Sequence, residues 1–229
     1  MLIGGFLKFS LIDYPGTVSA VIFTQGCPFR CHFCHNAELV IPKKFNSPIS
    51  LDSIVSFLDR RKGKLDGVVF TGGEPTLQTD LIPSIELVKE KGYLVKLDSS
   101  GINPQIISTL LERKLIDYIA MDIKAPLEKY QSITPTFVKQ KKIQESIELI
   151  LSSSIQHEFR TTLIKSLHSP EDILSMAKSI RGAQRYVLQR FRADKTLNPN
   201  FVSHKSFSNQ ELSSLKPAIE KEVLSCSFR

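Results

Sequence analysis

The stretch Thr17-Val-Ser-Ala-Val-Ile-Phe-Thr24 runs directly into Gln-Gly-Cys27-Pro-Phe-Arg-Cys31-His-Phe-Cys34-His-Asn36, and we expect the chain to be organised around this pair of segments. The first segment is β-branched and apolar without clean alternation, which predicts a strand buried on both faces. The second holds three of the four cysteines of the chain. It therefore predicts a cysteine loop at the carboxyl end of a buried strand.

This strand-loop-helix plan recurs along the sequence. Apolar runs predict six strands at 17–24, 67–71, 93–98, 116–123, 156–164 and 185–191. Helical spacing predicts helices at 50–61, 80–91, 104–114, 137–152, from Ser169 onward and at 209–224, where Pro217 predicts a break or a later start. Strands that alternate with helices indicate an α/β fold with a parallel sheet. An open doubly wound sheet and a partial barrel both remain, since six units fall short of a closed eight-stranded barrel.

Polar residues stand where the predicted strands end, and in both architectures ligands bind at that edge. These residues are Gly72-Gly73-Glu74-Pro75, Asp98, Asp122 and Lys124, with Arg160 and Gln189 as similar polar intrusions. The glycines are explained either by a turn or by close approach of a ligand, with Glu74 or a nearby carbonyl holding an ammonium group. The charged residues are explained either by ion pairs at the rim or by a binding role.

Cys27-x3-Cys31-x2-Cys34 offers three thiolates from one loop. Soft thiolates suit zinc or an iron–sulfur cluster. Zinc would need a fourth protein ligand, for which His32, His35 and Cys226 are the options. A [4Fe–4S] cluster held by three cysteines would leave one iron open to a small molecule, and this interpretation is favoured over zinc or free thiols. Cys226 is expected to be a free thiol, and three histidines are expected to be ordinary: His157, His168 and His204.

Composition limits the class of protein. The 229 residues, 41% of them hydrophobic, predict a single domain over 1–229, with a core at about 17–191 and a C-terminal helical extension at about 205–229. The net charge of +7 is spread over short basic runs, so we expect solvated helix faces and no nucleic acid partner. No signal peptide and no apolar run of about 18 residues is seen, which indicates a soluble cytoplasmic protein without a membrane partner.

The sequence resembles the radical S-adenosylmethionine enzymes. These share Cys-x3-Cys-x2-Cys after a first strand and Gly-Gly-Glu after the second, as at Cys27–Cys34 and Gly72–Glu74, and the repeating units extend the match from about Val18 to Phe191. Phe9-Ser-Leu-Ile-Asp-Tyr-Pro-Gly16 and the cysteine loop are similar to the activating enzymes of glycyl radical proteins. The Asp-Tyr-Pro-Gly form is similar to the anaerobic ribonucleoside-triphosphate reductase activating proteins.

The resemblance implies a partial (β/α)6 barrel with a [4Fe–4S] cluster and S-adenosylmethionine as cofactors. It implies that Cys27, Cys31 and Cys34 ligate three irons and that the cofactor chelates the fourth. It further implies cofactor-binding roles for Phe33, Cys34, His35, Gly72, Gly73, Glu74, Asp98, Asp122 and Lys124. No catalytic acid or base is implied, because the cluster and the cofactor carry the radical chemistry.

The implied reaction transfers an electron from reduced ferredoxin or flavodoxin through the cluster to the sulfonium. The resulting 5′-deoxyadenosyl radical removes a hydrogen atom from a glycine of a partner enzyme. Three other functions stay open: a pyruvate formate-lyase-type activase, a small-molecule enzyme similar to 7-carboxy-7-deazaguanine synthase, and a non-enzymatic zinc or redox-binding module. Formate-lyase activases have Asp-Gly-Pro-Gly and a histidine near the last strand, whereas this chain has Asp13-Tyr-Pro-Gly16 and Gln189-Arg190-Phe191. Arg160, Gln189, Arg190 and Cys226 therefore have no assigned role.

Overall fold

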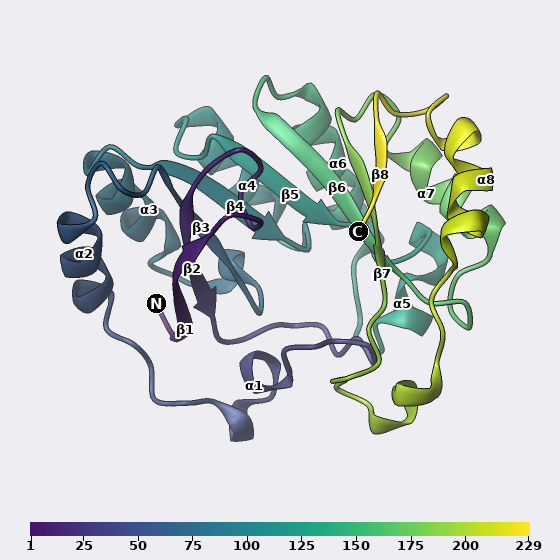
Figure 1. The fold of residues 1–229 in the computed structure, drawn as a ribbon, viewed down its shortest axis with the longest axis horizontal. Coiled ribbons are helices and arrows are strands. Elements are labelled where there is room, and N and C mark those ends of the chain that lie inside the picture. The colour runs from purple at the N-terminus through teal and green to yellow at the C-terminus, as the bar shows by residue number, and fades with distance from the viewer. The chain divides into compact units, whose positions relative to one another are not determined.

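The computed structural model describes residues 1–229, which divide into two compact units (Figure 1). Unit 1 comprises Met1–Pro28, Asn36–Ser99 and Asn103–Ile119. Unit 2 comprises Phe29–His35, Ser100–Ile102 and Ala120–Arg229. The cysteine loop thus passes from unit 1 to unit 2 and back, because Cys27 belongs to the first and Cys31 and Cys34 to the second.

Unit 1 is built on four paired strands. Its elements are β1 (Ile3–Ser10), β2 (Ser19–Thr24), β3 (Gly67–Gly72), β4 (Leu94–Ser99), α1 (Ala37–Val40), α2 (Leu51–Arg60), α3 (Leu81–Glu90), α4 (Pro104–Glu112) and the 3-10 turns Pro42–Lys44 and Pro75–Leu77. β1 runs antiparallel to β2, whereas β2, β3 and β4 are parallel. The middle of each parallel strand is buried, as Val21, Val69 and Val95 show with no exposed surface. The continuous apolar runs predicted for these strands reflect this burial on both faces.

Unit 2 repeats the parallel plan around three strands. Its elements are β6 (Gln156–Leu163), β7 (Tyr186–Arg190), β8 (Cys226–Phe228), α5 (Tyr130–Ile133), α6 (Gln140–Ser152), α7 (Pro170–Ser179), α8 (Asn209–Ile219) and the 3-10 turns Leu127–Lys129 and Pro199–Ser203. β6 pairs with β7 and β7 with β8, both in parallel. Figure 1 shows α7 beside α8. β5 (Tyr118–Asp122) is shared, since Tyr118 and Ile119 belong to unit 1 and its last three residues to unit 2.

The predicted helix start at Ser169 is confirmed in detail. The Ser169 hydroxyl accepts a hydrogen bond from the Asp172 backbone N–H, and the Asp172 carboxylate accepts one from the Ser169 N–H. Pro170 occupies the first helical position, where its missing N–H costs nothing. This reciprocal cap fixes where α7 begins.

The six predicted strands are present, but the sequence analysis missed two others. β1 pairs antiparallel at the edge, and its outer residues Leu7 and Phe9 are nearly half exposed, so it lacks the pattern of a buried strand. β8 has only three residues. The sequence therefore predicted the strands with strong apolar runs and missed the two weakest.

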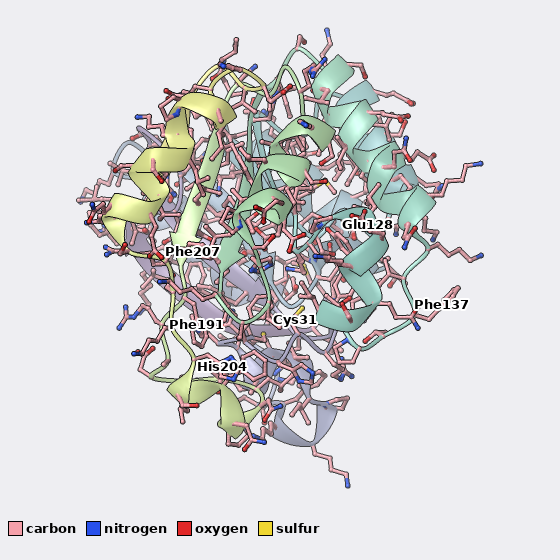
Figure 2. The ribbon with its side chains drawn as sticks, turned by 90° about the vertical axis from the view of Figure 1, so that its right-hand side faces the viewer. Cys31, Glu128, Phe137, Phe191, His204 and Phe207 are labelled. Carbon is pink, nitrogen blue, oxygen red and sulfur yellow. The ribbon has the colours of Figure 1, made fainter.

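Two predicted helices are wrong at their ends. α6 begins at Gln140 rather than Phe137, whose side chain is 75% exposed and points away from the unit in Figure 2. α8 contains Pro217 without a break and ends at Ile219 rather than Leu224. Pro217 has no N–H to donate to the carbonyl four residues earlier, so the helix lacks one backbone hydrogen bond and ends two residues later. No helix is long and apolar enough to cross a membrane.

Candidate functional site

The cysteine loop begins in unit 1 at the end of β2. Gly73 N–H donates to Thr24 O at 2.8 Å, and Glu74 N–H donates to Gly26 O at 2.8 Å. The glycine loop after β3 is thereby joined to the backbone directly before Cys27. These bonds extend the parallel pairing of β2 with β3, which ends with Thr24 opposite Gly72.

The two glycines are required by this close approach of two backbones. A Cβ on Gly73 would lie 2.1 Å from Gly26 O, and one on Gly72 would lie 2.3 Å from Thr24 N. Gly72 also has φ of +119°, a value that L side chains rarely adopt. Both positions therefore exclude any side chain, and they expose backbone groups in place of side chains.

Glu74 is fully buried and holds the glycine loop in place. Its Oε1 accepts hydrogen bonds from Thr76 N–H at 3.1 Å, from the Thr76 hydroxyl at 2.7 Å and from the Ser99 hydroxyl at 2.9 Å. A buried carboxylate is costly unless it is hydrogen-bonded, and these three donors meet that need. Glu74 therefore ties the end of β3 to the end of β4.

Asp98 forms the ion pair that strand alternation indicates. Its Oδ1 lies 2.5 Å from Lys96 Nζ, and its Oδ2 accepts a bond of 3.3 Å from the Thr71 hydroxyl. Lys96 is only 1% exposed, and its Nζ lies 5.7 Å from the centre of the Tyr118 ring. This ion pair offsets part of the free-energy cost of burying the Lys96 ammonium group in unit 1.

The charged residues of unit 2 form a network on β5, β6 and the residues after β5. Arg160 Nε donates to Asp122 Oδ1 at 2.9 Å, and Lys124 Nζ lies 3.5 Å from Asp122 Oδ2. Arg160 Nη1 also lies 4.0 Å from Oε1 of Glu158, which is 1% exposed. Burial by itself would raise the pKa of Asp122, but Arg160 and Lys124 outweigh it and the pKa is lowered. Asp122 is therefore held as a carboxylate.

Glu158 is a member of this network that the sequence analysis missed. The signal was present, because Glu158 and Arg160 are two residues apart in a strand and so share a face. Gln189, on the neighbouring β7, lies opposite Thr162 with their side-chain oxygens 3.5 Å apart, whereas Arg190 is exposed. The polar intrusions Arg160 and Gln189 thus both belong to unit 2.

The second half of the cysteine loop belongs to unit 2. Cys34 N–H donates to Cys31 O at 3.0 Å, which places the two cysteines on one turn. Burial raises the pKa of the Cys31 thiol to about 11, although Lys124 opposes this shift. Phe33 is buried, and His35 Nε2 lies 2.8 Å from Arg192 O. All four cysteines are free of disulfides, and Cys226 is buried on β8.

Unit 1 thus brings together Gly72, Gly73, Glu74 and the segment leading to Cys27, and it carries Asp98 on β4. Unit 2 brings together Cys31, Cys34, Asp122 and Lys124. No group of three or more His, Cys, Asp or Glu side chains is arranged to hold a single metal ion. The thiols nevertheless match in chemistry what an iron–sulfur cluster needs: three cysteines within eight residues, with no disulfide among them.

Sequence comparison places this chain beside a group of known enzymes. Residues 21–180 match the family described as the Radical SAM superfamily. A protein of Methanocaldococcus jannaschii named as a glycyl-radical enzyme activating enzyme is 33% identical over 231 residues, covering 97% of this chain and 93% of that protein. The pyruvate formate-lyase-activating enzyme of Clostridium pasteurianum is 30% identical over 78% of this chain and 76% of its own length.

Solved structures with low sequence identity share the fold. The structure of TYW1 with a lysine-pyruvate adduct bound has a TM-score of 0.62 and 17% identity, covering 90% of this chain and 74% of that one. Streptococcus suis SuiB bound to S-adenosylmethionine has a TM-score of 0.69 and 14% identity over 91% of this chain. The chain spans about half the length of SuiB, 49% of it. These likenesses, together with the family match, confirm the predicted α/β fold class.

Proposed function

The chain belongs to the radical S-adenosylmethionine superfamily and to its glycyl-radical enzyme activases, and from that premise we propose that it generates a glycyl radical on an anaerobic ribonucleoside-triphosphate reductase. Radical S-adenosylmethionine enzymes use a [4Fe–4S] cluster and S-adenosylmethionine. The observation that carries the proposal is the 33% identity to an activating enzyme over 97% of the chain, with the three cysteines in the spacing Cys-x3-Cys-x2-Cys.

We assign the cluster to Cys27, Cys31 and Cys34. A cluster held there would supply the electron for reductive cleavage of the sulfonium of S-adenosylmethionine, and these three thiolates would fix its place in the chain. The cofactor-binding residues we propose are Phe33, Cys34, His35, Gly72, Gly73, Glu74, Asp98, Asp122 and Lys124. Reduced ferredoxin or flavodoxin is the proposed electron donor.

The residues of this chain supply position and charge. The glycine loop would offer backbone groups to the amino group of the cofactor, because the Glu74 carboxylate already holds the loop through Thr76 and Ser99. Asp122 and Lys124 would offer the cofactor one negative and one positive charge. Arg160 pairs with Asp122 and so neutralises part of its negative charge. The burial of Cys31 and Phe33 would help to keep water from the cluster.

The reductase is favoured as partner by Asp13-Tyr14-Pro15-Gly16. Tyr14 is 5% exposed, and its ring centre lies 5.7 Å from that of Tyr118, so it packs in the core of unit 1. Asp13 Oδ2 accepts a hydrogen bond of 2.5 Å from the Ser10 hydroxyl. Tyr14 therefore anchors this turn to the core of unit 1. A pyruvate formate-lyase-type partner is the second candidate, and the likeness to the Clostridium enzyme supports it.

Activation assays with both partners test the proposal. The protein is reconstituted with iron and sulfide without oxygen, and dithionite with S-adenosylmethionine should then yield 5′-deoxyadenosine. Mixed with anaerobic reductase, it should give the doublet of a glycyl radical in the electron paramagnetic resonance spectrum, and Cys31→Ala should give none. A doublet with formate-lyase alone would favour the second candidate. Cofactor cleavage without a doublet on either partner would contradict the proposed function and would favour a small-molecule substrate.

A further inference from the structure

The chain between β7 and α8 lies along the second half of the cysteine loop. We call residues Phe191–His204 the strap. Asn198 N–H donates to His32 O at 3.0 Å, and Asn198 Nδ2 lies 3.3 Å from His32 Nδ1. His35 Nε2 lies 2.8 Å from Arg192 O. The strap therefore contacts the loop on both sides of Phe33, at residues directly next to Cys31 and Cys34.

Aromatic rings reinforce these polar contacts. The ring of Phe201 stacks with those of His32 and His204, whose centres lie 5.3 Å and 4.2 Å away. The His35 ring stacks on Phe191 with 5.8 Å between centres. Phe191 and Phe201 are each 7% exposed, and Phe191, His204 and Cys31, which are labelled in Figure 2, all belong to unit 2. Aromatic pairs of this kind add stability beyond the area that they bury.

The strap has internal bonds that fix its own shape. The Asn198 side chain accepts a hydrogen bond from Asn200 N–H at 3.0 Å and so caps the 3-10 turn Pro199–Ser203. The Thr196 hydroxyl donates to Asn198 O at 2.7 Å, and the His204 ring anchors the end of the strap to the Ser166 hydroxyl outside it. The strap therefore has a defined conformation of its own, against which the cysteine loop packs.

The cysteine loop itself has little structure of its own between Phe29 and His35. No helix or strand covers these residues, and the backbone bond within them is that from Cys34 N–H to Cys31 O. Holding one backbone residue in a single conformation costs about 1–2 kcal/mol. Contacts from elsewhere must offset that cost, and the grouping of Phe29–His35 with unit 2 reflects them.

We propose that the strap is a positioning element for the cluster ligands, holding Cys31 and Cys34 in place before any cluster binds. Asn198 and Phe201 are its positioning residues, and neither touches the reacting atoms. The link to the cluster rests on the proposed function, whereas the ordering of the two cysteines does not. A strap of this kind makes cluster uptake faster and cluster loss slower, because the loop need not be ordered by the metal itself.

Thiol reactivity in the cluster-free protein tests the ordering step. Phe201→Leu keeps an apolar side chain but removes the ring stack, and Asn198→Ala removes the side-chain contact with His32. The matched control is Val202→Ala, since Val202 is 56% exposed on the same strap. Iodoacetamide labelling is followed for each cysteine by mass spectrometry. We expect both strap variants, Phe201→Leu and Asn198→Ala, to raise the labelling rate of Cys31 and Cys34 by about tenfold over the control, because the cysteine loop would open locally more often.

The other two cysteines serve as internal controls. Cys27 belongs to unit 1, next to backbone that the glycine loop holds, and its rate should not change. Cys226 on β8 reports unfolding of unit 2, and its rate should also not change. Unchanged rates at Cys31 and Cys34 in both variants would overturn the proposal. A rise at Cys226 equal to that at Cys31 in both variants would overturn it too, since the strap would then support the whole unit rather than the loop.

Iron release from the reconstituted protein tests the functional step. Transfer of iron to a chelator should be at least about fivefold faster in Phe201→Leu and Asn198→Ala than in Val202→Ala. Equal release rates would overturn the role in cluster retention. If wild-type protein took up no cluster while the thiol pattern held, the proposed function would fail and the ordering of the loop by the strap would stand.

Discussion

The strand ends of unit 1 and unit 2 hold their polar groups in different ways. In unit 1, the end of β3 is fixed by backbone hydrogen bonds to Thr24 and Gly26, and the Glu74 carboxylate accepts hydrogen bonds from hydroxyl and N–H donors. In unit 2, the corresponding polar groups are charged side chains bonded to one another, namely Asp122, Lys124, Arg160 and Glu158.

The difference separates two kinds of precision. Backbone geometry in unit 1 leaves no room for a side chain at Gly72 or Gly73, so the loop has one arrangement. The charges of unit 2 are held by pairing of one side chain with another rather than by backbone bonds. We therefore expect substitutions in unit 1 to act through backbone strain and those in unit 2 through unbalanced charge, and four measurements sharpen or break this contrast.

Gly72→Ala should have the largest effect. The new Cβ would meet Thr24 N at 2.3 Å and Thr24 O at 2.6 Å, and both atoms belong to paired backbone. We expect the free energy of unfolding to fall by more than about 3 kcal/mol, measured by urea denaturation of the cluster-free protein. Gly92→Ala is the matched control, because Gly92 also has a positive φ but no atom within 4 Å of the added carbon. It should cost about 1 kcal/mol. Equal losses would show that strain at φ, rather than the close approach of two backbones, explains Gly72.

Arg160→Met should have the next largest effect, in unit 2. The change leaves Asp122 without its closest cation, whereas the buried Glu158 loses Arg160 but keeps Arg229, whose Nη2 lies 3.8 Å from its Oε2. Breaking such a network by removing one partner should lower the free energy of unfolding by about 2–3 kcal/mol, since Asp122 is partly exposed. Glu158→Gln added to Arg160→Met should recover part of the loss.

Arg181→Met is the control for this change, because the Arg181 side chain is 72% exposed where it pairs with Glu222 of the same unit. Exposed pairs contribute little, so the urea midpoint should hardly move. A loss at Arg181 as large as at Arg160 would contradict the view that the network of unit 2 depends on buried charge.

Ser99→Ala returns to unit 1 with a smaller expected effect. It removes the hydroxyl that donates to Glu74 from the end of β4. A hydrogen bond to a buried carboxylate contributes about 1.5–3 kcal/mol, and two donors from Thr76 remain, so a loss near about 1.5 kcal/mol is expected. Ser84→Ala is the control, because Ser84 is equally buried but donates to the helical carbonyl of Asp80. Similar losses for both serines would remove the special place of Glu74.

The sequence was sufficient where local patterns determine structure. Unbroken apolar runs predicted the buried parallel strands, and Ser169-Pro170-Glu171-Asp172 predicted a helix start whose cap is present. The charged residues at strand ends were explained either by ion pairs or by a binding role, and Asp98 pairs with Lys96 and Asp122 with Lys124, each two positions away. These features depend on residues within a few positions of each other.

The sequence was insufficient where the partner is remote. The Gly-Gly-Glu motif predicts that Glu74 binds a ligand, but it does not predict the hydrogen bond that Glu74 accepts from Ser99 on another strand, β4. The strap has no periodicity, and Asn198 meets His32 across 166 positions of sequence. No local pattern encodes such contacts, because they arise only when the strands between them have been paired.

The smallest expected effect concerns the way in which His168 supports the network of unit 2. His168 is 2% exposed, its Nδ1 accepts from Ile164 N–H at 3.1 Å, and its Nε2 lies 2.9 Å from Lys124 O. Burial lowers the pKa of His168, although these backbone contacts oppose the shift. The unfolded chain therefore binds a proton more readily than the folded one, so the free energy of unfolding should fall as the pH falls through the ordinary histidine range near about 6.5.

Urea midpoints at about pH 7.5 and about pH 5.5 measure this dependence above the range in which carboxylates titrate. His168→Gln should lose less stability on acidification than wild type, and the loss that remains should include a contribution from His157, whose pKa burial also lowers. His204→Gln is the control, since His204 is partly exposed on the strap. If His168→Gln and wild type lost equal stability between the two pH values, protonation of His168 would not be what weakens its contact with the Lys124 backbone. The charges of unit 2 would then be held by their mutual pairing alone.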